Sequence, residues 1–141
     1  MIPRVLALAL VVVLSVAPAA EPAGSTRQAS QPATILFVGN SFMYGAGSAA
    51  RYYRAHTVTD LNAEGQGGVP ALFKVFANQA GLDYAVSLET VGGSGLDLHV
   101  EKKAAIIGRP WDHVVMLGQS MLDNTRPGDS TKLVRATKQI A

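Results

Sequence analysis

The feature that most constrains the fold is a set of three short segments with strand patterns, each followed by a turn of glycine and small polar residues. The pairs of segment and turn are 34–38 with 39–41, 83–91 with 92–95, and 111–118 with 118–120. The first segment is an apolar run rich in β-branched residues, which predicts a buried strand, and the second alternates Tyr84, Val86 and Leu88, which also predicts a strand. The chain therefore resembles a series of strands that stop at polar turns.

Helical patterns separate the predicted strands. One begins at Pro70 and ends before Gly81, a second covers 96–107 before Gly108, and a third starts near Pro127. Strands that alternate with helices predict parallel pairing in an α/β domain. Because a ligand site in such a sheet lies beyond the carboxyl ends of the strands, we expect the three turns to gather at one edge.

The N-terminus predicts export. Residues 1–19 contain an early Arg4, an apolar stretch and then small residues, as a secretory signal peptide does. An uncleaved N-terminal anchor is the alternative, although the apolar stretch is short for a membrane span. Residues 20–33 are small, polar and proline-bearing, which predicts a flexible linker before a domain over 34–141. We expect a secreted or periplasmic protein with no stable membrane span after cleavage.

Composition excludes several classes of function. The chain has no cysteine, so disulfides, thiolate nucleophiles and Cys-ligated zinc are impossible. Its 12 basic and 10 acidic residues are scattered, which disfavours nucleic-acid binding. No His, Asp and Glu spacing fits a metal site, and no Gly-Lys-Ser/Thr fits a phosphate loop. We therefore predict no cofactor and no metal.

The first turn raises the question of a nucleophile. A serine hydroxyl needs an adjacent base, and N–H donors must face the oxyanion that forms on the attacked carbonyl. Ser41 follows the first strand directly, where its own N–H is available. Gly95 in the second turn and the amide of Gln119 in the third are the candidates that complete such a hole.

The segment "ILFVGNSF" resembles the first block of the SGNH hydrolases, also called GDSL-type esterases. The resemblance implies a flavodoxin-like, three-layer α/β/α sandwich with Ser41 as nucleophile and first oxyanion donor. It implies a second donor in "VGGSGLDLH", with Gly95 the best match and Gly93 its rival. The family's third block is Gly-x-Asn. Here Ser120 stands at the Asn position, and Gln119 is an amide one position early.

The family's last block, Asp-x-x-His, supplies the base and is missing. The histidines are His56, His99 and His113, and none follows the third strand. We expect His99 on the surface of its helix, although Glu101 nearby offers a partial His–acid pair. The resemblance covers residues 34 to about 120, so we interpret the chain as the N-terminal part of a truncated domain.

These observations predict an exported serine hydrolase that cleaves esters through an acyl-enzyme. An acylated carbohydrate or another small-molecule ester is the expected substrate class. The alternative is a secreted α/β domain without catalysis that binds carbohydrate, since shared folds often carry unrelated sites.

Overall fold

The computed structural model describes residues 31–140, and a compact unit begins at Gln31. The predicted signal peptide and residues 20–30 of the predicted linker lie outside the described residues. The first strand begins at Ala33, one residue earlier than expected. No helix among residues 31–140 is long and apolar enough to cross a membrane.

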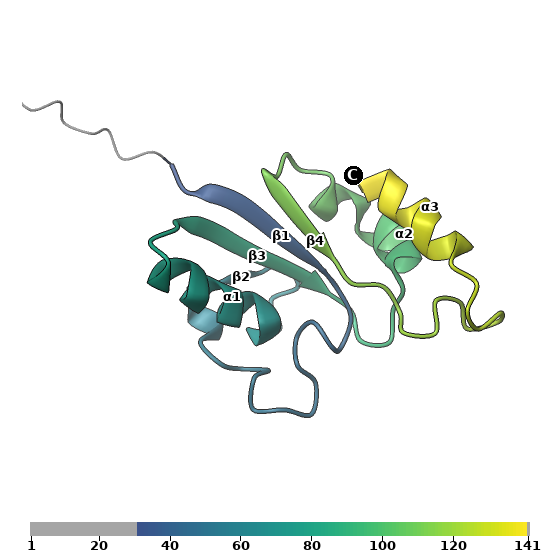
Figure 1. Cartoon of the computed structure of the whole chain (residues 1–141), viewed down its shortest axis with the longest axis horizontal. Coiled ribbons are helices and arrows are strands. Elements are labelled where there is room, and N and C mark those ends of the chain that lie inside the picture. Colours follow the sequence, from purple (N-terminus) through teal and green to yellow (C-terminus); the bar gives the residue numbers. More distant parts are fainter. Residues whose placement is uncertain (1–30, 141) are drawn as a thin grey trace, which may run out of the picture. The chain divides into compact units, whose positions relative to one another are not determined.

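Strands and helices alternate along the described chain (Figure 1). The strands are β1 (Ala33–Gly39), β2 (Thr59–Asp60), β3 (Tyr84–Thr90) and β4 (His113–Met116). The helices are the 3-10 helix η1 (Ala55–Thr57), α1 (Gly68–Gln79), α2 (Leu96–Ile107) and α3 (Thr131–Ile140). The three long strands and three α-helices confirm the order of elements predicted from the sequence.

The four strands form one parallel sheet in the order β2-β3-β1-β4. β1 is central, and it pairs along its full length with β3, from Ala33 opposite Tyr84 to Gly39 opposite Thr90. The α/β class with a parallel sheet is thereby confirmed. The finer assignment to a flavodoxin-like three-layer sandwich stays a prediction.

Helices pack on both faces of β1, which explains why this strand is apolar from Ile35 to Val38. Ile35 and Phe37 belong to one core cluster, against which Phe73 of α1 packs. Leu36 and Val38 belong to a second cluster with residues of α2 and α3. Figure 1 shows α1 apart from the α2–α3 pair in agreement with these two cores.

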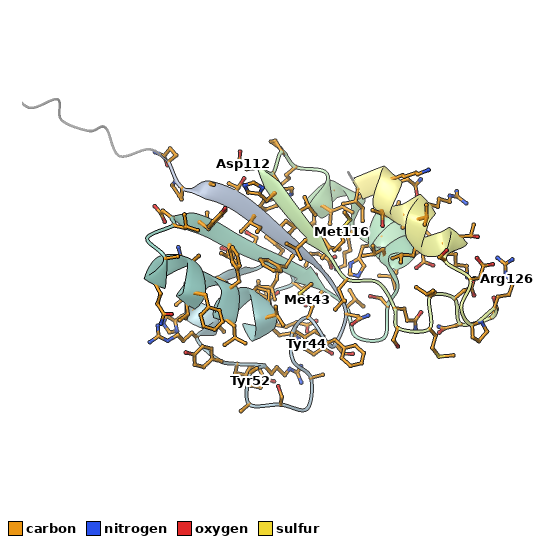
Figure 2. All side chains as sticks on the ribbon, in the orientation of Figure 1. Met43, Tyr44, Tyr52, Asp112, Met116 and Arg126 are labelled. Carbon is orange, nitrogen blue, oxygen red and sulfur yellow. The ribbon has the colours of Figure 1, made fainter. Side chains whose placement is uncertain are left out.

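All three predicted turns leave the sheet at the carboxyl ends of their strands. β1 continues into a long loop, β3 into a short turn before α2, and β4 into a second long loop before α3 (Figure 1). Figure 2 shows Met43 and Tyr44 just past the end of β1, whereas Asp112 lies at the opposite end of the sheet, where β4 begins. The fold thus directs three loops to one edge.

Candidate functional site

Asn40 joins the three turns. It is 2% exposed, and its Nδ2 donates to the carbonyl oxygens of Ser94, at 3.2 Å, and Gly118, at 3.3 Å. Its Oδ1 accepts the N–H of Phe42 at 3.1 Å, which stabilises the first turn as its residue type predicts. The expected meeting of the three turns at one sheet edge is confirmed.

Ser41 lies half-buried beside this junction. Its carbonyl accepts the N–H of Ala46 at 2.8 Å. Within residues 31–140, neither its hydroxyl nor its own N–H is hydrogen-bonded to a protein group. A half-buried hydroxyl and an unengaged N–H are what an oxyanion-stabilised nucleophile requires.

Main-chain contacts with the start of α1 hold the loop that carries Ser41. The N–H of Val69 donates to Met43 O at 2.9 Å, and the N–H of Gly68 donates to Ala50 O at 3.0 Å. Gly68 has φ +56°, and a Cβ there would lie 2.5 Å from Met43 O. Only glycine permits both the left-handed backbone and this close approach.

The second turn offers two glycines in different roles. Gly93 has φ +73°, and no atom lies within 4 Å of the position of a Cβ, so the backbone conformation explains its residue type. Gly95 is the N-cap residue of α2 with an extended backbone. Among the described residues its N–H has no protein acceptor. The N–H of Gly93 is equally unengaged among the described residues, so hydrogen bonding does not separate the two glycines as donors. The Asp97 carboxylate beside Gly95 opposes negative charge there.

The third turn contributes Gln119 rather than Ser120. The Gln119 Nε2 donates to the carbonyl of Gly93 at 3.3 Å, so this side chain reaches across to the second turn. An amide nitrogen carries two hydrogens, and one remains for another acceptor. Ser120 is exposed. The amide one position early thus reaches the junction despite its displacement from the family pattern.

The histidine predicted on a helix surface is in fact completely buried. His99 is 0% exposed, and its Nδ1 contacts Oε2 of Glu89, which is also 0% exposed. Its Nε2 lies 2.9 Å from Oγ of Ser94. The expectation of a surface histidine was wrong because β3 places Glu89 on the face that α2 covers. The partner is Glu89, and Glu101 is exposed.

A signal for this cluster was present in the sequence. His99 follows Leu96 by three residues, a helical spacing that puts both on the buried face of α2. Glu89 follows Leu88 in a strand that is buried from Val86 to Thr90, and a buried carboxylate requires a polar partner. A buried acid and a histidine on an apolar helix face together predict contact.

A cavity of about 200 Å³ lies beside the second and third turns. It is lined in part by Gly95, Gln119, Asp123 and Lys132. Asp123 is 1% exposed, and the hydroxyl and N–H of Thr125, followed by Lys132, hold the pKa of this carboxyl well below its usual value. The cavity therefore carries a fixed negative charge opposite a lysine, 3.2 Å from Asp123.

The two other histidines lie outside the three turns. His56 is exposed within η1. His113 begins β4, and its ring meets the edge of Tyr84 at 5.8 Å, near the opposite end of the sheet. Among the described residues no group of three His, Asp or Glu side chains is placed to hold a metal ion.

Comparisons of the chain with models of protein families, with curated proteins and with solved structures find no match. The resemblance to SGNH hydrolases consequently rests on the sequence of the three turns alone.

Proposed function

We propose that the chain is an exported serine hydrolase of the SGNH type that cleaves small-molecule or carbohydrate esters. The observation that carries the proposal is the side chain of Asn40, which ties the turn bearing Ser41 to the two turns that bear Gly95 and Gln119. In this proposal the nucleophile and the donors on these three turns act on the same substrate.

The chemistry of the proposal uses the groups at the junction that have no hydrogen-bond partner within residues 31–140, which are the hydroxyl and N–H of Ser41, the N–H of Gly95 and one amide hydrogen of Gln119. The Ser41 Oγ attacks the acyl carbonyl carbon, and its proton passes to a base. The N–H groups of Ser41 and Gly95, with the Gln119 amide, stabilise the resulting oxyanion. Collapse breaks the ester C–O bond and releases the alcohol, and water then hydrolyses the acyl-enzyme.

The base in this proposal comes from outside residues 31–140. Within that range His99 is engaged with Glu89 and Ser94, and His56 and His113 belong to η1 and β4 rather than to the three turns. A serine without its base retains only the contribution of the oxyanion hole and binding. The described residues therefore supply the nucleophile and the hole, and reactivity should respond to an added base.

A fluorophosphonate probe with added imidazole tests this proposal. The Ser41 Oγ forms the new O–P bond, fluoride leaves, and imidazole takes the proton. Mass spectrometry should locate the phosphonyl group on Ser41, with a rate that rises with imidazole concentration. Ser48→Ala, a change of an exposed serine in the same loop, is the matched control and should label like the parent. Equal labelling of Ser41→Ala would reject the proposal.

Carbohydrate binding without catalysis is the second candidate, and the surface of the loop favours it. The side chains of Phe42 and Tyr52 are 69% and 63% exposed, and the guanidinium of Arg51 lies 5.1 Å from the ring centre of Tyr52. Exposed aromatic rings are suited to stacking on sugars. Saturable binding of oligosaccharides by a chain that fails to label at Ser41 would support this candidate over the hydrolase.

A further inference from the structure

Three buried polar side chains lie in a row beneath the second turn. The exposed fractions of Glu89, His99 and Ser94 are 0%, 0% and 5%. Glu89 Oε2 contacts His99 Nδ1, and His99 Nε2 lies 2.9 Å from Ser94 Oγ. The order carboxylate, imidazole and hydroxyl is that of a Ser–His–acid triad, so its role in this chain needs an explanation.

The direction of the hydrogen bonds argues against a second nucleophile. The Ser94 Oγ also lies 2.8 Å from the carbonyl of Val91, which can only accept. Because a hydroxyl has one proton, Ser94 donates it to Val91 and accepts a hydrogen bond from His99 Nε2–H. In an activated serine the hydroxyl donates to the imidazole instead. His99 therefore holds Ser94 and does not deprotonate it.

The row is anchored at its other end as well. Glu89 Oε1 accepts from Asn62 Nδ2 at 3.1 Å, and Asn62 Oδ1 accepts from Lys103 Nζ at 2.8 Å. Two positions of α2, His99 and Lys103, are thus fixed to the end of β3. Since buried polar groups that are fully hydrogen-bonded allow few alternatives, this network restricts how α2 can lie at its N-terminus.

Ser94 connects this network to the candidate site. Its side chain is held by His99, its N–H donates to Val91 O at 3.3 Å, and its carbonyl accepts from Asn40 at 3.2 Å. The next residue is Gly95, whose N–H is the second oxyanion donor of the proposed function. A displacement of Ser94 would move Gly95 relative to Asn40 and hence to Ser41.

We propose that Glu89 and His99 are positioning residues that hold the turn 93–95, and with it the Gly95 N–H, in place beside Ser41. The inference rests on the proposed function, because it assigns Gly95 to the oxyanion. The row of Glu89, His99 and Ser94 resembles a triad but here supports the oxyanion hole, to which it is connected through Ser94. The buried pair acts on the rate through geometry alone.

The test compares Glu89→Gln and His99→Gln in the full chain, with Glu101→Gln and His56→Gln as matched controls at exposed sites. The probe is the fluorophosphonate with imidazole at one fixed concentration, and folding of each variant is verified by circular dichroism. We expect the first-order rate of Ser41 phosphonylation to fall about tenfold or more while the affinity for the probe stays unchanged, as when an oxyanion donor is displaced. The two controls should react like the parent.

A second measurement does not depend on reaction. Amide hydrogen exchange of Ser94, whose N–H donates to Val91 O, is followed by NMR and should accelerate in Glu89→Gln and His99→Gln but not in the controls. Unchanged Ser94 exchange in a folded variant would overturn the positioning role, even if Ser41 reacts. A phosphonyl group on Ser94 would also overturn it. Equal labelling of the parent and Ser41→Ala, with accelerated Ser94 exchange in the variants, would reject the hydrolase and retain the support of the turn.

Discussion

The loop after β1 and the turn after β3 meet at the same edge of the sheet but are held in different ways. The first is fixed by main-chain hydrogen bonds and by glycine, as at Gly68, where a Cβ would meet Met43 O at 2.5 Å. The second is fixed by buried side chains, with Glu89 and His99 beneath it. A substitution at Gly68 should therefore destabilise the loop after β1, whereas truncation of Glu89 or His99 should destabilise the turn after β3.

The serines of the two regions show the same contrast. Ser41 has a half-buried, unengaged hydroxyl and no base among residues 31–140. Ser94 contacts a histidine that itself contacts an acid, yet it is 5% exposed and its proton points to a carbonyl. A nucleophile needs access and the correct direction of proton donation, so the neighbours of a serine alone do not identify one.

The largest expected loss of stability comes from a substitution that disrupts the main-chain contacts of the loop after β1. Gly68→Ala should lower the free energy of unfolding by about 3 kcal/mol or more, through left-handed strain and overlap with Met43 O. Gly47→Ala is the matched control, because φ is +73° there and nothing lies within 4 Å. It should cost about 1 kcal/mol. Urea unfolding measures both, and equal losses would refute the close approach.

An intermediate effect separates the two serines by stability. Ser94→Ala removes the hydrogen bonds to His99 and Val91 within a buried cluster and should cost about 1–3 kcal/mol. Ser41→Ala removes no hydrogen bond among the described residues and should stay within about 0.5 kcal/mol of the parent. Chemical unfolding of both variants tests the contrast, which a large loss in Ser41→Ala would contradict.

The smallest effect concerns the third loop and depends on pH. Hydrogen bonds from Thr125 hold the pKa of Asp123 well below its usual 3.8, so the unfolded chain binds the proton more readily than the folded one. The stabilisation is complete above pH 3.8 and is lost as the pH falls toward the lower folded pKa. Asp123→Asn should therefore flatten the acid limb of stability against pH. An acid limb identical to that of the parent would show that Asp123 does not contribute.

Prediction from the sequence succeeded where the pattern is local. The apolar run of β1, the helix signals around Pro70 and Gly81, and the glycine turns gave the sheet class and the edge where the turns meet. β2 was not predicted, because Thr59–Asp60 is too short to show any alternation. The segment between β1 and α1 is a loop apart from β2 and η1.

Prediction failed where the structure depends on partners from other elements. His99 was placed on a helix surface, whereas it is completely buried. Its burial depends on Glu89, ten residues earlier on another element, and on the face of β3 that α2 covers. The bridging role of Asn40 likewise depends on carbonyls of two other turns, which no local pattern encodes.

The contacts of Asn40 also bear on when the site forms during folding. They join residues separated by 54 and 78 positions, and the second requires β4 to have paired with β1. Contacts of such sequence separation form slowly, because a long stretch of chain must be ordered before they stabilise it. A folding intermediate without β4 would have an exposed Ser41 next to an Asn40 with only part of its partners. The candidate site would therefore be fully assembled only in the folding step in which β4 pairs with β1 and completes the sheet.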